Sequence, residues 1–307
     1  VYVLRKSSYA EHLQSLSNRL VTQGLQPIHI KLADSHLLSE DILEMVNAGI
    51  VSITVVDDFK AKLWAKVLPN IRVHEDIKVK SGNILGWAVR KNNPELQKSL
   101  TLFTKTVKKG TLHGNMLFKR YYKNPRWIKN PLAESERSKF RKVIDIFSKY
   151  ADTYGFDVLA ATAQAYQESH LDHSKRSNQG AIGIMQILPS TAADPNVGIS
   201  DISSLEDNIH AGVKYLAFLR DRYFSESQIS EENILAFSWA AYNAGPANVR
   251  KMRIKAKKMG LDPNIWFGNV ELAAAKVVGR ETVQYVRNIF KYYIAYSLVS
   301  DMLVQSS

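Results

Sequence analysis

The pattern of apolar and polar positions changes near the middle of the chain. In the first 90 residues, short apolar runs alternate with amphipathic helical segments. Strands are expected at residues 1–4, 28–32, 51–56, 71–79 and 84–89. Helices are expected at 11–23, ending at Gly24, and at 39–46, ending at Gly49. Strands that alternate with helices predict an α/β domain with parallel strands.

The second half of the chain has an almost purely helical pattern. Apolar side chains recur with helical spacing at Phe140, Val143, Ile144 and Phe147. Two prolines interrupt the periodicity within residues 123–134, which indicates a linker. The expected organisation is therefore α+β overall, with an α/β domain at 1–122, a linker at 123–134 and an all-α domain at 135–307.

Composition narrows the class of protein. The chain has 307 residues, of which 45% are hydrophobic and 23% charged, as is ordinary for a soluble protein with two domains. No apolar run approaches the roughly 18 residues of a membrane span. No signal peptide is recognisable and residue 1 is not Met, so we expect a processed or truncated piece of a longer precursor.

Charge and the absence of cysteine limit the chemistry. Without cysteine there are no disulfides, thiolate metal sites or cysteine nucleophiles. The net charge of +12 suits a polyanionic partner such as the bacterial cell wall, anionic lipid or nucleic acid, but lysines scattered over solvated faces explain it as well. Because nucleic-acid binding rests on charge alone, we do not expect it. His170 and His173 lack further ligands at metal-binding spacing, so neither a metal nor another cofactor is expected.

Glu168 is the candidate general acid. It follows a helical segment of small side chains at residues 160–166. A carboxyl half-buried at the C-terminal end of a helix has a raised pKa, because burial and the helix dipole both disfavour the anion. Such a group stays protonated near neutral pH and can protonate a glycosidic oxygen. Taken alone, a glutamate in this position is more often a solvated surface residue.

Four segments in fixed order carry a family resemblance, namely 166–170, 180–192, 241–245 and 281–286. Together they resemble the catalytic domain of the soluble-type, goose-lysozyme-like lytic transglycosylases, which cut the glycan strands of bacterial peptidoglycan. The resemblance spans residues 135–300 and implies a lysozyme-like fold. It implies Glu168 as the catalytic residue. The substrate-binding residues that it implies are Ser177, Met185, Gln186, Tyr242, Asn243 and Tyr285.

A second carboxylate would be needed for hydrolysis of the two-carboxylate kind. The candidates are Asp172, close to Glu168 in sequence, and Asp207, whose setting favours a role in capping a helix. Neither has support from a motif, which favours the non-hydrolytic route. The product, a 1,6-anhydro ring on N-acetylmuramic acid, is implied by the resemblance. A lysozyme-type hydrolase remains the alternative.

The N-terminal region resembles the second lobe of periplasmic amino-acid-binding proteins, on the segments 6–9, 55–58, 85–96 and 109–112. The first lobe of that family is not in the sequence. The resemblance implies that Ser7, Ser8 and Asp57 hold an amino acid or muropeptide. The alternatives are helix capping by the serines and a turn after a strand at Asp57.

The pairing of the two regions resembles the membrane-bound lytic transglycosylase F family. This implies peptidoglycan as the partner, regulation by the N-terminal domain, and a location in the bacterial periplasm at the outer membrane. Membrane association would then depend on a part of the precursor that is not in this sequence. A sensory binding module that grips glycan without cutting it is the competing hypothesis.

Overall fold

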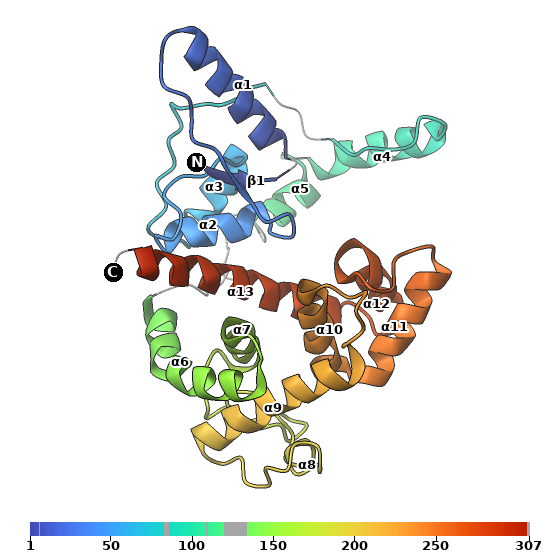
Figure 1. Ribbon diagram of the computed structural model, residues 1–307. Coiled ribbons are helices and arrows are strands. Elements are labelled where there is room, and N and C mark those ends of the chain that lie inside the picture. Colours follow the sequence, from blue (N-terminus) through green and yellow to red (C-terminus); the bar gives the residue numbers. More distant parts are fainter. Residues whose placement is uncertain (6, 83–85, 109, 120–133, 306–307) are drawn as a thin grey trace. The chain divides into compact units, whose positions relative to one another are not determined.

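The computed structural model describes residues 1–5, 7–82, 86–108, 110–119 and 134–305. The chain divides into two compact units, Val1–Ala133 and Glu134–Ser307 (Figure 1). The linker expected at 123–134 lies outside the described residues except for Glu134, which begins a helix.

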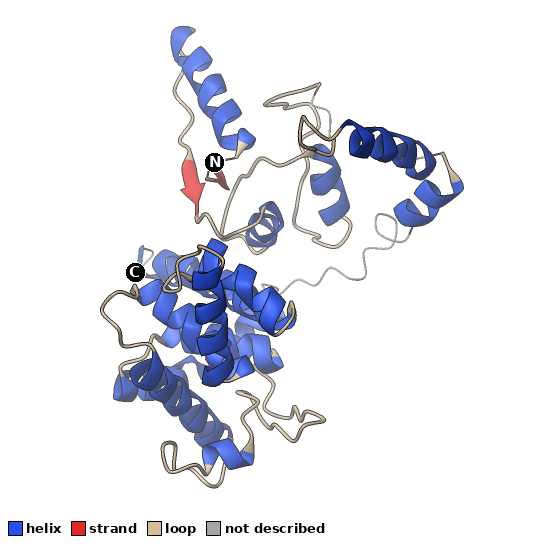
Figure 2. Cartoon of the chain, turned by 90° about the vertical axis from the view of Figure 1, so that its right-hand side faces the viewer, coloured by secondary structure: helices blue, strands red, loops and turns tan. Residues whose placement is uncertain are grey.

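The first unit begins with a strand, a helix and a second strand. Strands β1 (Tyr2–Leu4) and β2 (Lys31–Ala33) pair in parallel, with Val3 opposite Leu32. Helix α1 (Ser8–Thr22) connects them, as a parallel pair requires. The short sheet is visible as two small strands in Figure 2.

Four helices follow in the described part of the first unit. They are α2 (Ser39–Asn47), α3 (Asp58–Trp64), α4 (Pro94–Val107) and α5 (Leu112–Leu117). Leu43, Trp64 and Leu68 form a small core between α2 and α3. By contrast, α4 buries none of its residues.

The expected α/β sheet is largely absent from the described residues. Helices α1 and α2 confirm the two helix predictions, but the strand predictions at 51–56 and 71–79 are wrong, as is the described part of 84–89. Residues 51–56 contribute one sheet-like bond, from the Tyr2 N–H to the Ile53 carbonyl at 2.9 Å. Ile53, Ile77 and Trp87 are 60%, 69% and 62% exposed. Alternating apolar residues form a strand only where a neighbour pairs with it and covers one face.

The second unit is helical, as its sequence predicts. Its elements are α6 (Glu134–Tyr154), α7 (Val158–Ser169), α8 (Pro189–Ala192), α9 (Leu205–Tyr223), α10 (Glu231–Ala244), α11 (Pro246–Lys258), the π-helical turn η2 (Trp266–Val270), α12 (Glu271–Val277) and α13 (Glu281–Gln305). Between α7 and α8, Ile182 forms isolated bridges with Arg176 and Ile187. In the described residues, no helix combines the length and apolar character needed to cross a bilayer.

Helix α7 lies in the core of this unit, packed against α6 and α13 (Figure 1). Residues 160–166 are all buried, and the alanines among them allow close approach of the neighbouring helices. Asp157 caps the start of α7 by accepting a hydrogen bond from the Ala160 N–H at 2.8 Å. Its other oxygen accepts from the Tyr293 hydroxyl of α13 at 2.9 Å. The cap therefore also fixes α7 to α13.

Candidate active site

Glu168 lies in the last turn of α7, one residue before the helix ends at Ser169. The next two residues, His170 and Leu171, have φ angles of 59° and 57°, in the left-handed region. The His170 N–H donates to the Tyr166 carbonyl at 2.9 Å, which closes the helix. The chain therefore turns away sharply and leaves Glu168 half-buried at the helix end.

Tyr285 is the hydrogen-bond partner of Glu168. It comes from the first turn of α13, and its hydroxyl donates to Glu168 Oε1 at 2.5 Å. The Tyr285 side chain is buried, so the contact is shielded from water. A donor held in this way favours the ionised carboxylate.

Burial and the Tyr285 bond act on Glu168 in opposite directions. Burial is the larger effect and raises the pKa of Glu168 to about 7, whereas the hydrogen bond from Tyr285 lowers it. Near neutral pH both protonation states are therefore populated. Burial and the nearby Glu168 charge raise the pKa of Tyr285 and of Tyr242 well above the usual value, so both stay protonated donors.

The loop after α7 is closed by Ser177. The Ser177 N–H donates to the Ala181 carbonyl at 2.8 Å, and its Oγ accepts from the Ala181 N–H at 3.0 Å. Ser177 is part-exposed, so its hydroxyl remains near the loop surface. In this structure its contacts define the shape of the loop.

Gln186 also holds the loop together. Its backbone has a φ of 45°, which is uncommon for a residue with a side chain. The side-chain Nε2 donates to the carbonyls of Gly183 at 2.8 Å and Lys175 at 3.2 Å. Both amide N–H groups are thus used internally, and the amide oxygen is the atom left for a substrate.

Met185 does not line the surface, in contrast to the sequence-based expectation. Its side chain is fully buried and lies over Gly212 of α9, where an added Cβ would come within 2.5 Å of Met185 Cγ. Met185 therefore supports the loop from the core side. Its carbonyl accepts from the Tyr242 hydroxyl at 2.8 Å.

Tyr242 and Asn243 connect α10 to the rest of the site. The Tyr242 hydroxyl fixes the loop through Met185, as above. The exposed Asn243 accepts a hydrogen bond from the Thr282 hydroxyl at 2.8 Å, which joins the end of α10 to the start of α13. Helices α7, α10 and α13 and the loop at 177–187 thus converge around Glu168.

Asn208 of α9 is a central residue that the sequence analysis did not identify. It is fully buried, and its Oδ1 accepts from the Met185 N–H at 3.0 Å. Its Nδ2 donates to the carbonyls of Ile182 at 3.0 Å and Ile202 at 3.3 Å. A Cβ at Gly183 would lie 2.3 Å from Nδ2, so glycine is required there. The sequence feature that could have identified Asn208 is an amide side chain on the apolar face of a helix.

Ser169 ties the end of α7 to the same loop. Its buried hydroxyl donates to the Ile184 carbonyl at 2.8 Å and accepts from the Asp172 N–H at 3.1 Å. The structure shows that Ser169 fixes the position of Glu168 relative to the loop.

Neither candidate for a second carboxylate acts on Glu168. Asp207 lies in the first turn of α9, where its N–H donates to Ser204 Oγ at 3.0 Å and its Oδ2 accepts from the Ser204 hydroxyl at 2.6 Å, so Ser204 is the cap and Asp207 its partner. Asp172 accepts from the Ser174 N–H and hydroxyl, which lower its pKa. Across the described parts of the chain, no other carboxylate contributes to the pKa of Glu168. In the same residues, no cluster of His, Asp or Glu is arranged to hold a metal ion.

The serines and Asp57 of the first unit lie at two helix starts. Ser7 caps α1, accepting from the Ala10 N–H at 3.3 Å, and Ser8 is exposed in the first turn. Asp57 precedes α3 and accepts from the Tyr9 hydroxyl at 2.7 Å. Burial and this bond raise the pKa of Tyr9 to about 12. Tyr9 therefore brings the two helix starts together.

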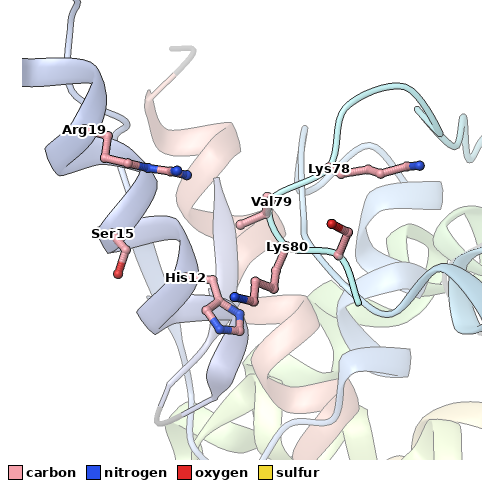
Figure 3. Close-up of a pocket in the computed structure, with 7 residues that line it drawn as sticks. His12, Ser15, Arg19, Lys78, Val79 and Lys80 are labelled. Atoms are coloured by element: carbon pink, nitrogen blue, oxygen red, sulfur yellow. The ribbon is translucent and has the colours of Figure 1, made fainter. Parts of the chain in front are cut away.

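A hollow in the first unit lies elsewhere, between α1 and residues 78–81 (Figure 3). Its volume is about 500 Å³, and its lining contains no carboxylate. The lining residues are His12, Ser15, Arg19, Lys78, Val79, Lys80 and Ser81. Figure 3 shows His12 and Lys80 extending toward one another from the two segments. None of Ser7, Ser8 and Asp57 lines it.

Comparison with known proteins shows what this chain is similar to. Residues 145–264 match the model of the transglycosylase SLT domain. The membrane-bound lytic murein transglycosylase F of Desulfosudis oleivorans is 33% identical over 314 residues, which cover 95% of this chain and 65% of that protein. The protein of the same name from Shewanella sediminis is 28% identical, covering 95% of this chain and 62% of that protein. The chain thus spans slightly less than two thirds of these relatives.

Two solved structures also resemble the chain. The lytic transglycosylase Slt of Pseudomonas aeruginosa, solved as an inactive mutant, matches with a TM-score of 0.40 and 23% identity, over 51% of this chain and 24% of that one. The soluble lytic transglycosylase SLT70 of Escherichia coli matches with a TM-score of 0.38 and 21% identity, over 93% of this chain and 45% of that one.

Proposed function

We propose that this chain, whose second unit carries a transglycosylase SLT domain, is a peptidoglycan lytic transglycosylase that cleaves the β-1,4 bond between N-acetylmuramic acid and N-acetylglucosamine. One observation carries the proposal. Glu168, at the end of α7, has a pKa near 7 and a single buried donor, Tyr285. A carboxyl in that state can both give and take a proton near neutral pH.

The reaction uses Glu168 twice. The protonated carboxyl first donates to the glycosidic oxygen, and the bond from that oxygen to C1 of N-acetylmuramic acid breaks, leaving an oxocarbenium-like centre. The Glu168 carboxylate then takes the proton of the 6-hydroxyl of the same sugar. The freed oxygen attacks C1 and closes a 1,6-anhydro ring. No water is consumed, and Glu168 ends protonated as it began.

Tyr285 supports the middle of this cycle. Its hydroxyl donates to Glu168 and therefore stabilises the carboxylate formed after the first proton transfer. Burial favours the protonated state that starts the cycle. The two effects together keep the pKa close to the range in which both steps are feasible.

The substrate contacts follow from the atoms left free at the loop and at α10. We propose that the Gln186 amide oxygen accepts from a sugar N–H or hydroxyl, and that the exposed Asn243 amide and the Ser177 hydroxyl contact the strand. Tyr242 acts through Met185, which it holds in place. Among the residues that the structure describes, no second carboxylate acts on Glu168, which favours this route over a lysozyme-type hydrolase.

Location and regulation extend the proposal. We propose a periplasmic enzyme associated with the outer membrane, in line with the words membrane-bound and murein in the names of the relatives. The first unit would regulate activity through an amino acid or muropeptide at Ser7, Ser8 and Asp57, where two helix starts meet. Saturable binding of such a ligand, lost in Asp57→Ala, would support this role, and no binding would remove it.

The test of activity is the clearing of purified peptidoglycan sacculi. Wild type should reduce their turbidity, and Glu168→Gln should not. The matched control is Glu231→Gln, which removes one exposed carboxylate at the start of α10 and should retain activity. Clearing by Glu168→Gln at the wild-type rate contradicts the proposal.

A further inference from the structure

Helix α11 is strongly basic along its whole length. Its 13 residues include no aspartate or glutamate. Its basic residues are Arg250, Lys251, Arg253, Lys255, Lys257 and Lys258. Such an imbalance within one helix creates a local positive potential.

Only Arg253 of these residues is neutralised within the described structure. It pairs with Glu226 at 2.6 Å and also donates to the Pro263 carbonyl. Lys251 donates to the neutral Asn248 amide at 3.3 Å. For the other four, no carboxylate partner occurs among the described residues. The five cations other than Arg253 are here called the α11 basic face.

This face lies opposite the side that packs into the core. Val249, Met252 and Ala256 are buried, at the spacing of one helix side. The cations of the α11 basic face are exposed on the remaining surface. Ile254 lies among them and is 48% exposed. The surface therefore offers positive charge around an apolar side chain.

Helix stability accounts for part of this pattern. Lys255, Lys257 and Lys258 are in the last turn, where cations interact favourably with the helix dipole. Arg250 and Lys251 are not, and Lys251 and Lys255 are four residues apart, a spacing at which like charges repel. The cations are thus more numerous than the helix itself requires.

The position of α11 links this surface to the site. Gly245, with a φ of 83°, separates α10 from α11, so α11 begins three residues after Asn243. At about 1.5 Å per residue, α11 extends about 20 Å from that point. Figure 1 shows α11 continuing from α10 beside α12. A polymer bound near Asn243 can therefore continue along α11.

We propose that the α11 basic face binds the carboxylate-bearing peptide stems of the glycan strand that is cut at Glu168. The proposal rests on the proposed function, because it assigns a second region of the same substrate. The stems repeat along the strand and combine carboxylates with alanine methyl groups. The cations of the α11 basic face attract the carboxylates of the stems, and Ile254 offers an apolar contact to their methyl groups.

The test measures binding separately from cleavage. The full-length chain carrying Glu168→Gln is sedimented with purified sacculi over a range of salt concentrations. In that background, Lys251→Gln/Lys255→Gln/Lys258→Gln should weaken binding roughly tenfold at low salt, and the difference should shrink as salt screens the charges. Glutamine preserves helix propensity, so the helix should remain intact.

The matched control removes three cations from α6 and α9, as Lys142→Gln/Lys214→Gln/Arg222→Gln. It has the same net charge as the first variant and should bind as the parent does. Glycan strands released from sacculi by an amidase, which removes the stems, provide the second control once they are immobilised on beads. The Glu168→Gln parent and the two triple variants should bind equally well to these glycan strands.

Three results would overturn the proposal. The first is an equal loss of binding to sacculi in both triple variants. The second is a difference between the two triple variants that persists on strands without stems. The third comes from a parallel measurement with vesicles that contain phosphatidylglycerol, if the α11 triple variant loses binding to these vesicles but not to sacculi. The last would assign the α11 basic face to a membrane surface. Failure of the proposed function is separate, because it would show as no clearing of sacculi by wild type whatever the binding result.

Discussion

The Tyr285 hydroxyl donates to Glu168 Oε1 at 2.5 Å, across a sequence separation of 117 residues. The contact joins the start of α13 to the end of α7, and the two helices pack along their lengths. Burial of the carboxyl raises its pKa, and Tyr285 limits the rise. The packing of α7 against α13 therefore sets the protonation of the group that we propose does the chemistry.

Removing the Tyr285 hydroxyl should raise the pKa of Glu168 further, because the carboxylate loses its donor while burial persists. In Tyr285→Phe, the loss of activity at alkaline pH should move to higher pH by about one pH unit, with a lower maximal rate. The measurement is sacculus clearing from pH 5 to 9. Tyr293→Phe, which removes a comparable bond to Asp157 on the same helix, is the control and should leave the profile unchanged. A shift to lower pH, or none, would refute this account of Tyr285.

The raised pKa of Glu168 predicts that stability falls with pH. The ordinary value is 4.5 and the folded value about 7, so between them the folded state binds more protons than the unfolded state. The stability that protonated Glu168 contributes to the folded state is therefore fully present below about pH 4.5 and is lost as the pH rises through 7. The loss is roughly 3 kcal/mol.

Glu168→Gln should remove this pH dependence. Relative to wild type, the variant should gain stability between pH 5 and 8.5, measured as the free energy of unfolding in urea at each pH. Glu231→Gln should follow wild type. A difference between Glu168→Gln and wild type that is constant with pH would mean that the pKa of Glu168 is not raised.

Asn208 should be essential to the loop that carries Gln186. Asn208→Ala leaves the Met185 N–H and two carbonyls without their partner, which should cost about 2–4 kcal/mol of stability and most of the activity. Urea unfolding and sacculus clearing measure the two effects. Asn196→Ala, at an exposed amide bonded to Asp194, should change neither much. Normal stability in Asn208→Ala would show that these bonds contribute little.

Gln164 should be a weak point of α7. Its side chain is fully buried, and neither amide atom has a hydrogen-bond partner within the described structure. Gln164→Leu should therefore stabilise the protein by about 1–2 kcal/mol. Thr162→Val, which removes a buried hydroxyl already bonded to the Val158 carbonyl, is the control and should not stabilise it. Destabilisation by Gln164→Leu would indicate an internal partner for the amide, such as a bound water.

Sequence patterns predicted the helices of the second unit better than the contacts between them. The apolar period and the small side chains before Glu168 were enough to expect a helix that ends there, and α7 does so. Periodicity could not show which of two neighbouring loop residues turns inward. The family resemblance implied Met185 as a substrate-binding residue, but its side chain is in the core, where Gly212 leaves room for it.

Other differences come from interactions distant in sequence. The role of Asn208 depends on a loop more than 20 residues earlier, which no local pattern reveals. The strand predicted at 51–56 fails because alternation specifies a strand only when a partner and a covering layer are present. In contrast, the helix start near Asp207 is a local feature that the sequence indicated, although the cap is Ser204 and not Asp207.

The central claim is that Glu168 cleaves the strand without adding water. Mass spectrometry of the soluble products from purified sacculi tests it most directly. Wild type should release muropeptides that end in 1,6-anhydro-N-acetylmuramic acid, lighter by one water than products of hydrolysis, and Glu168→Gln should release none. Reducing ends from the wild type, or anhydro products from Glu168→Gln, would contradict the account.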